Sequence, residues 1–141
     1  MADNLPEKVF EKMFENDNCS KWMGVELVEI SHGYCKIAMT VKKDMLNGFG
    51  ILHGGIAYAF ADSAFAFASN SGGQVSVSIH GSMNFSKSAK EGDKLLAEAK
   101  VLNDGRKTAE YDCTVFHEES NKPYYFFRGT VYRKEMDVLK M

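Results

Sequence analysis

An isolated carboxylate within an apolar run is the feature of this sequence best suited to chemistry. Asp62 lies in the stretch from Ile56 to Ala68, which otherwise consists of Ile, Ala, Tyr, Phe and a single serine. A carboxylate in apolar surroundings costs several kcal/mol unless it is paired, hydrated or protonated, so a chain that keeps one usually has a use for it. We interpret Asp62 as a candidate general base or nucleophile. The alternative is a carboxylate that points into a water-filled gap or caps a neighbouring element.

Two glycines directly before this run supply a second possible element of a site. The segment is His53-Gly54-Gly55. At a helix start, such glycines leave backbone N–H groups unpaired at the positive end of the dipole, with no side chain to block a ligand. These groups can stabilise an oxyanion that develops on a carbonyl oxygen, while a carboxylate activates water or attacks the carbonyl. Close helix packing or a simple turn is the alternative explanation for the glycines.

The spacing between the glycines and the acid indicates a shared site. Asp62 lies eight residues beyond Gly54, which is about 12 Å along one helix, so a single carbonyl cannot touch both. In a two-fold dimer with antiparallel helices, the start of one helix lies beside the middle of the other. The spacing therefore predicts a homodimer with two equivalent sites, each formed by Asp62 of one chain and Gly54 of the other, and an inactive monomer.

The remaining sequence predicts an α+β layout. Leu5 to Glu15 has helical spacing, and the run around Asp62, with six alanines and no polar face, favours a helix buried on nearly all sides. Strands are predicted at 23–30 and 34–41, as a hairpin, and at 75–86, 94–102, 107–117 and 124–133, as an antiparallel meander. In the 75–86 strand, alternation predicts an apolar face made by Val75, Val77, Ile79, Met83 and Phe85, with serines such as Ser78 on the polar face.

Composition limits the class of protein. The 141 residues, 45% of them hydrophobic, predict one folded domain over residues 1–141, with residues 1–18 covering an edge as a helical segment. A net charge of -2 and the absence of a Lys/Arg block argue against nucleic acid and anionic membranes as partners. The apolar run is too short to span a bilayer, and the N-terminus carries no secretory signal. We expect a soluble protein.

The cysteines and histidines suggest neither a disulfide framework nor a metal site. Cys19, Cys35 and Cys113 are odd in number and far apart, and the four histidines form no ligand pattern with them. We therefore expect reduced thiols in a cytoplasmic protein, without a metal.

The motif residues also resemble those of a known family. Asn47-Gly-Phe-Gly-Ile-Leu-His53-Gly54-Gly55, followed by Ala61-Asp62-Ser63-Ala64 and Asn70-Ser71, resembles the signature of hotdog-fold acyl-CoA thioesterases of the PaaI type. The resemblance covers roughly residues 20–133. It implies a long helix wrapped by a curved antiparallel sheet of about five or six strands, with two sheets joined edge to edge in a dimer, and commonly a dimer of dimers. The implied activity is hydrolysis of aryl- or fatty-acyl-CoA to free acid and CoA, with CoA as part of the substrate and no cofactor.

The resemblance also implies roles for individual residues. Asn47 matches the position of an amide that holds the attacking water or the thioester, and its side chain can both donate and accept. Ser78 lies where some relatives place a hydroxyl that orients the carboxylate or water. His53 is interpreted as fixing the turn and lending its backbone to the oxyanion site, with a general base as the alternative. Lys87, Lys90, Arg106 and Lys107 lie near strand ends that could meet CoA phosphates, and a solvated rim explains them equally well.

Two other functions stay open beside the thioesterase. A hotdog hydratase or dehydratase would need paired Asp and His residues beside a Gly-Asp-x-Asn-Pro-like segment, which the sequence lacks. A non-catalytic acyl-CoA-binding oligomer would keep the fold without turnover. A second thioesterase subclass carries its acid in an Asp-x-x-Gly-His-like segment, and Asp44-Met-Leu-Asn-Gly48 does not match it. The acid on the helix therefore stays the better candidate.

Overall fold

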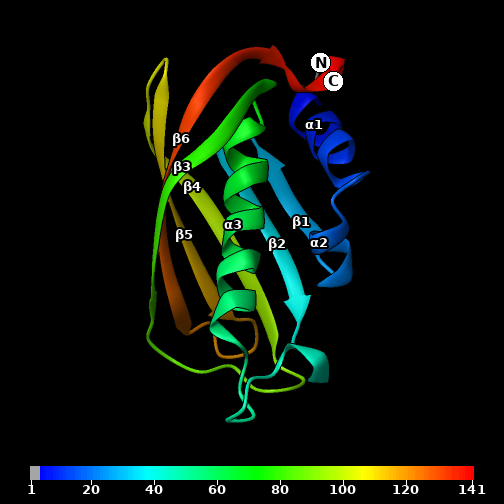
Figure 1. The fold of residues 1–141 in the computed structure, drawn as a ribbon, viewed down its shortest axis with the longest axis vertical. Helices are drawn as coiled ribbons and strands as arrows, with labels where there is room; N and C mark the ends of the chain where they lie inside the picture. The colour runs from blue at the N-terminus through cyan, green and yellow to red at the C-terminus, as the bar shows by residue number, and fades with distance from the viewer. Residues whose placement is uncertain (1–3) are drawn as a thin grey trace.

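The apolar run becomes the helix around which the rest of the chain folds. In the computed structural model, which describes residues 4–141, α3 (Gly54–Asn70) lies against a single six-stranded antiparallel sheet (Figure 1). The helix buries small and aromatic side chains in the core: Ala57, Phe60, Ala61, Ala64, Phe65, Phe67 and Ala68. A long helix packed on a curved antiparallel sheet confirms the predicted α+β hotdog arrangement.

The strands follow the predicted segments closely, with one difference in topology. They are β1 (Glu26–Ser31), β2 (Tyr34–Thr40), β3 (Gln74–Phe85), β4 (Lys94–Asp104), β5 (Thr108–His117) and β6 (Pro123–Asp137). Their order in the sheet is β1-β2-β4-β5-β6-β3. Only β4 to β6 form a meander, because β3 pairs with β6 and lies at the edge. The prediction of one meander running through every strand after the helix is therefore wrong for β3.

The remaining helices are short. The predicted N-terminal helix is α1 (Leu5–Phe14), which packs on α3 through Phe10 and Phe67, with ring centroids 4.7 Å apart. The first three residues of the predicted 1–18 segment lie outside the described residues. A second helix, α2 (Asn18–Trp22), and the 3-10 helices η1 (Lys43–Met45) and η2 (Val138–Lys140) were not predicted. None of the helices within residues 4–141 is both long and apolar enough to cross a membrane.

The predicted alternation along β3 is wrong in the middle of the strand. Val77 and Ile79 were expected in the core, and they are 39% and 59% exposed. Val75 is buried, Met83 packs against the core, and Phe85 lies opposite Tyr125 on the helix side. The register shifts between Ser78 and His80, where β3 carries one more residue than its partner β6. Such a bulge changes which residues face the core, and a period of two cannot reveal it. The position of β3 at the edge of the sheet leaves the remaining apolar side chains uncovered.

The bulge moves Ser78 to the helix side of the sheet. Residues opposite one another in an antiparallel pair share a face, and Ser78 lies opposite Val131, which is buried in the core. Beyond the bulge the same face continues with Gly81, where a Cβ atom would collide with the Tyr58 hydroxyl of α3. The serine predicted to lie on the polar, outward side therefore faces α3.

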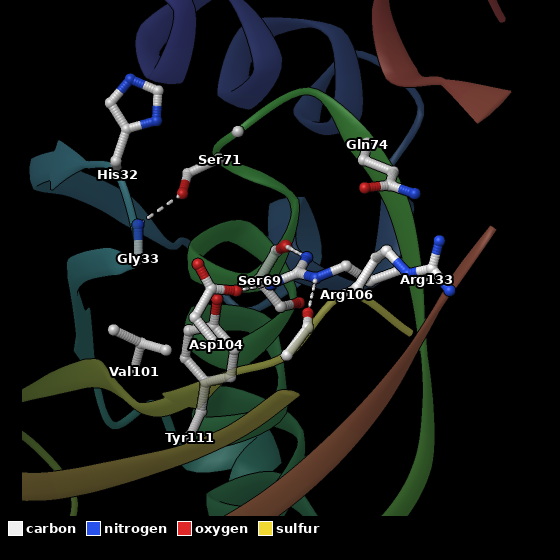
Figure 2. Close-up of a pocket in the computed structure, with 12 residues that line it drawn as sticks. His32, Gly33, Ser69, Ser71, Gln74, Val101, Asp104, Arg106, Tyr111 and Arg133 are labelled. Carbon is white, nitrogen blue, oxygen red and sulfur yellow. Dashed lines mark hydrogen bonds and ion pairs between the residues drawn. The ribbon is translucent and has the colours of Figure 1, made fainter. Parts of the chain in front are cut away.

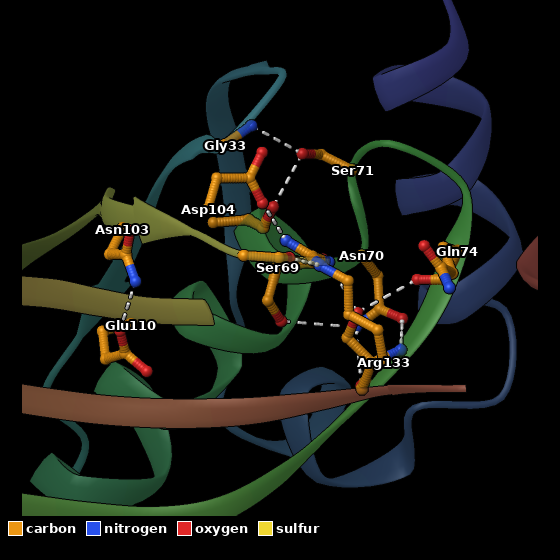
Figure 3. Close-up of polar contacts among 12 residues, drawn as sticks. Gly33, Ser69, Asn70, Ser71, Gln74, Asn103, Asp104, Glu110 and Arg133 are labelled. Atoms are coloured by element: carbon orange, nitrogen blue, oxygen red, sulfur yellow. Dashed lines mark hydrogen bonds and ion pairs between the residues drawn. The ribbon is translucent and has the colours of Figure 1, made fainter. Parts of the chain in front are cut away.

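The end of α3 is clamped by two polar side chains that belong to the family-like motif (Figure 3). The Asn70 side chain accepts from Ser76 N–H at 2.8 Å and donates to the Ser76 carbonyl at 3.1 Å. The Ser71 hydroxyl accepts from Gly33 N–H at 2.8 Å. These bonds fix the helix end to the start of β3 and to the β1–β2 turn. The motif residues Asn70 and Ser71 therefore position α3.

We expect Asn70→Ala to destabilise the fold by about 2 kcal/mol or more, because it leaves two buried backbone groups of Ser76 unpaired. Denaturant unfolding measures this loss. The matched control is Asn103→Ala, which removes an exposed hydrogen bond to Glu110 and should change stability by less than about 0.5 kcal/mol. Equal effects of the two substitutions would contradict the clamp.

Candidate active site

The loop before α3, residues 46–52, forms hydrogen bonds within itself and leads into the start of the helix. Leu46 and Leu52 form a β-bridge, and the Asn47 N–H donates to the Ile51 carbonyl at 2.8 Å. Inside the loop, Asn47 Oδ1 accepts from the N–H groups of Phe49 at 2.9 Å and Ile51 at 3.3 Å. The acceptor of the Asn47 amide is thus occupied by its own loop, and the Nδ2 group is the part of this side chain suited to a ligand.

The three consecutive backbone N–H groups at the helix start differ in their hydrogen-bond partners. The His53 N–H donates to the Met45 carbonyl at 2.8 Å, and the Gly55 N–H donates to His53 Nδ1 at 2.9 Å. The Gly54 N–H has no partner within residues 4–141 and lies in the first turn of the helix, where no intrahelical acceptor exists. Of the predicted donors, Gly54 is therefore the one available to an oxyanion.

His53 acts here as the N-cap of α3. Its Nδ1 accepts a hydrogen bond, so this nitrogen carries no proton in the arrangement shown and the neutral ring is protonated on Nε2. Its carbonyl accepts from Ile56 and Ala57 N–H, the usual first bonds of a helix. These contacts agree with the predicted turn-fixing role for His53 and engage both its backbone groups.

Asp62 lies on the third turn of α3, half-buried. It accepts no hydrogen bond from residues 4–141, and no buried polar side-chain atom in that range lacks a partner, so its oxygens reach solvent. Burial, and after it the negative charge of Asp17, raises the pKa of Asp62 above the usual range of an aspartate. A half-buried carboxylate with raised pKa and open oxygens is suited to accept a proton from water.

Tyr58 is a neighbour of the acid that the sequence interpretation assigned to the core. It precedes Asp62 by one turn, on the same face of α3, and its hydroxyl lies against Gly81 of β3. Burial, and after it the Asp62 charge, raises the pKa of Tyr58. Tyr58 and Asp62 therefore share a face of α3, and from that face the Tyr58 hydroxyl reaches β3, where Ser78 also faces the helix.

One chain alone does not bring the two halves of the site together. Asn47, His53 and Gly54 lie at the start of α3, and Asp62 follows on the same helix, about 12 Å away by helix geometry. The Phe85 ring packs at the helix start, where a Cβ atom on Gly54 would lie 3.2 Å from it. The described residues also contain no group of three or more His, Cys, Asp and Glu side chains that could hold a metal ion.

A cavity of about 470 Å³ opens at the other end of α3 and is separate from these residues (Figure 2). Its polar wall centres on Arg133, whose side chain is 11% exposed and donates to Asp104 at 2.5 Å and to the Ser69 carbonyl at 2.9 Å. Neither Asp62 nor Gly54 lines this cavity. The guanidinium joins the β4–β5 hairpin to the helix end, and its role is structural.

Comparison with known proteins gives the family. The profile of the thioesterase superfamily matches residues 49–124, a range that holds the helix start, Asp62 and Ser78. The chain belongs to the thioesterase superfamily. Residues 49–124 leave out Asn47 and the whole N-terminal segment.

Several individual proteins and solved structures are similar along most of this chain. The acyl-coenzyme A thioesterase PaaI of Escherichia coli is 36% identical over 121 residues, 86% of each chain, and the E. coli PaaI structure has a TM-score of 0.89 over 94% of this chain and 98% of its own. A protein of Archaeoglobus fulgidus named as an esterase is 43% identical over 133 residues, 94% of this chain and 86% of its own. A Streptococcus mutans structure with bound acetyl-CoA has a TM-score of 0.75 at 28% identity, covering 78% of this chain and 88% of its own.

The position of Asp62 gives this thioesterase a pH-dependent stability. Because the pKa of Asp62 is raised on folding, the folded chain binds the proton more tightly than the unfolded chain, and ionisation works against folding. We expect Asp62→Asn to raise the thermal midpoint at neutral pH, with an advantage that shrinks as the pH falls through the raised pKa toward the ordinary range of aspartate. Thermal unfolding followed by circular dichroism between pH 4 and 8 measures this.

The control for that measurement is Asp44→Asn, the same change of charge at an exposed residue, which should leave the pH dependence of the midpoint unaltered. A midpoint below that of the wild type for Asp62→Asn at neutral pH would contradict the burial argument.

Proposed function

We propose that this thioesterase hydrolyses aryl- or fatty-acyl-CoA thioesters to the free acid and CoA. The observation that carries the proposal concerns two groups on one helix: a half-buried Asp62 and, in the first turn, the Gly54 N–H. Neither has a hydrogen-bond partner within residues 4–141. The E. coli relative is named an acyl-coenzyme A thioesterase, and the S. mutans structure holds acetyl-CoA. Both support CoA as the thiol part of the substrate.

The chemistry divides between a donor group and an acid. The thioester oxygen accepts from the Gly54 N–H and from Asn47 Nδ2, which stabilises the charge that develops on it. Asp62 takes a proton from water as the oxygen of that water attacks the carbonyl carbon, and the tetrahedral intermediate then collapses with loss of the CoA thiolate. Ser78, on the helix side of β3, is suited to orient the water or the carboxylate.

The raised pKa of Asp62 suits the activation of water. A carboxylate whose pKa lies nearer to the working pH is a stronger base toward water. The competing route, in which Asp62 attacks the carbonyl to give an anhydride that water then opens, also gains from a more basic carboxylate, so the pKa alone does not decide between the two. We assign Asp62 as the general base and keep the anhydride as the competing mechanism.

We propose further that the site is assembled in a homodimer through β3. This edge strand is 12 residues long and carries no Asp, Glu, Lys or Arg from Gln74 to Phe85. Val77 and Ile79 are exposed along it. A long, uncharged edge with exposed apolar side chains is suited to pair with another strand. The opposite edge, β1, is half as long, with 6 residues, and holds Glu26 and Glu29.

The exposed stripe of α3 supports the same assembly. The helix was predicted to be buried on nearly all sides, yet a stripe at Gly55, Ala59, Asp62 and Ala66 is only partly covered. Residues at this spacing share one face of a helix. Pairing of β3 with its two-fold copy places these stripes beside each other in antiparallel directions, so that Asp62 meets the partner's Gly54.

Thiol release from a panel of aryl- and fatty-acyl-CoA thioesters tests the activity. We expect turnover by the wild type, and Asp62→Asn should lower kcat/KM by at least about two orders of magnitude because the proton acceptor is lost. Calorimetry with the same acyl-CoA thioesters measures binding, which distinguishes hydrolysis from binding without turnover. Binding without thiol release on every substrate would favour the acyl-CoA-binding oligomer, and near-wild-type rates for Asp62→Asn would reject the assigned base.

Gly54→Pro tests the oxyanion donor with little change to the helix. Proline is tolerated at the first helical position, and His53, with φ -60° and ψ 131°, already has the extended backbone that a residue before proline requires. Loss of one oxyanion donor should lower kcat by about a hundredfold or more. Gly54→Ala adds a Cβ atom against the exposed Phe85 ring but keeps the N–H, and should lose much less activity.

Subunit mixing tests the shared site with the same variants. In an equal mixture of Asp62→Asn and Gly54→Pro chains, half of the dimers are mixed, and each mixed dimer has one intact site of two, so activity should recover to about a quarter of the wild-type level. Verified subunit exchange without recovery would place both groups of each site in one chain and would reject the dimer proposal.

A further inference from the structure

A second carboxylate is tied to the turn of α3 that carries the acid. Asp17 is the N-cap of α2, where Oδ1 accepts from Ser20 N–H at 3.0 Å and Oδ2 accepts from the Ser20 hydroxyl at 2.6 Å. Ser20 is fully buried, and its Oγ lies 2.8 Å from Oγ of Ser63, the residue after Asp62. The chain Asp17–Ser20–Ser63 therefore connects α2 to the acid by hydrogen bonds.

The direction of these bonds follows from the number of protons. The Ser20 hydroxyl has one proton, and Asp17 accepts it. In the second bond Ser63 must therefore be the donor and Ser20 the acceptor. The Ser63 proton is then engaged by Ser20 Oγ. The serine beside the acid presents lone pairs to its surroundings and cannot donate a hydrogen bond that would stabilise the Asp62 carboxylate.

The charged neighbour of Asp62 also disfavours the ionised form of the acid. Within residues 4–141 the titratable groups whose charges interact with it are Asp17 from α2, Tyr58 from its own helix and Cys113 from β5. Asp17 is the charged neighbour that contributes, after burial, to the raised pKa of Asp62. A negative neighbour and a withheld donor both disfavour the ionised acid.

We propose that Asp17 is a positioning residue for the reaction at Asp62, holding the acid's turn of α3 through Ser20 and Ser63 and keeping a negative charge beside the acid. The inference rests on the proposed function for its catalytic meaning. It adds a residue from α2, outside the residues that the superfamily profile matches, to the control of the base. The consequence is a stronger base toward water at neutral pH.

Asp17→Asn isolates this effect because asparagine is an equally good N-cap. Its Oδ1 can still accept from Ser20 N–H, while its Nδ2 donates to the Ser20 hydroxyl where the carboxylate accepted. The Ser20 proton then turns to Ser63, so the connection between α2 and α3 is kept while the charge is removed. Loss of the negative charge favours the ionised acid and so lowers the pKa of Asp62.

The first measurement is the pH profile of kcat/KM. We expect the midpoint of the acid limb in Asp17→Asn to move down by about half a pH unit or more. The matched control is Asp137→Asn, the same substitution at the N-cap of η2, and its acid limb should stay in place. An acid limb that does not move in Asp17→Asn, or that moves equally in both variants, would overturn the proposal.

The second measurement needs no substrate. The Asp62 carboxyl carbon is assigned in ¹³C-aspartate-labelled protein by its absence in Asp62→Asn, and its titration is followed in the wild type and in Asp17→Asn. A lower midpoint in Asp17→Asn supports the proposal even where no acyl-CoA is hydrolysed, a result that would count against the proposed function alone. Equal midpoints in the two proteins would overturn the role of Asp17 whatever the activity.

Discussion

Desolvation of one carboxylate is the constraint on which the other features of this protein depend. Asp62 sits on a helix whose neighbouring residues Ala61 and Ala64 are fully buried, so α3 cannot rotate to expose the acid without opening the core. The helix is also fixed at its end by Asn70 and Ser71. The cost of holding an aspartate there therefore appears as the raised pKa of Asp62.

At the start of the same helix, one backbone N–H donor is left without a partner among residues 4–141, while its neighbours are paired. Unpaired backbone groups are costly when buried, and this turn limits their number. Met45 accepts the first N–H and the His53 ring accepts the third. Only the Gly54 N–H between them is left without a partner among residues 4–141. The histidine that looks like a general base in the sequence thus sets which amide can meet an oxyanion.

The sequence was sufficient for the features that depend on periodicity and on the motif. The alanine-rich run, the strand segments and the role of Asp62 as an exceptional residue could all be inferred without coordinates. The bulge in β3 could not, because one extra residue in a strand leaves no mark in its composition, and it moved Ser78 from the outer to the inner face. Asp17 was missed for a different reason. Its capping bond to Ser20 is local, but the bond from Ser20 to Ser63, which leads to the acid, joins segments more than forty residues apart.

The positions of the two sheet edges explain why the proposed dimer contact and Asp62 lie on the same side of the protein. Tyr58 precedes Asp62 by one turn and lies against Gly81, so the acid side of α3 faces β3. β1 lies at the other end of the strand order, about 24 Å away at the usual strand spacing. Pairing through β1 would leave the acid far from any second helix. An uncharged β3 edge is therefore needed wherever the Gly54 donor of one chain is to serve the acid of another.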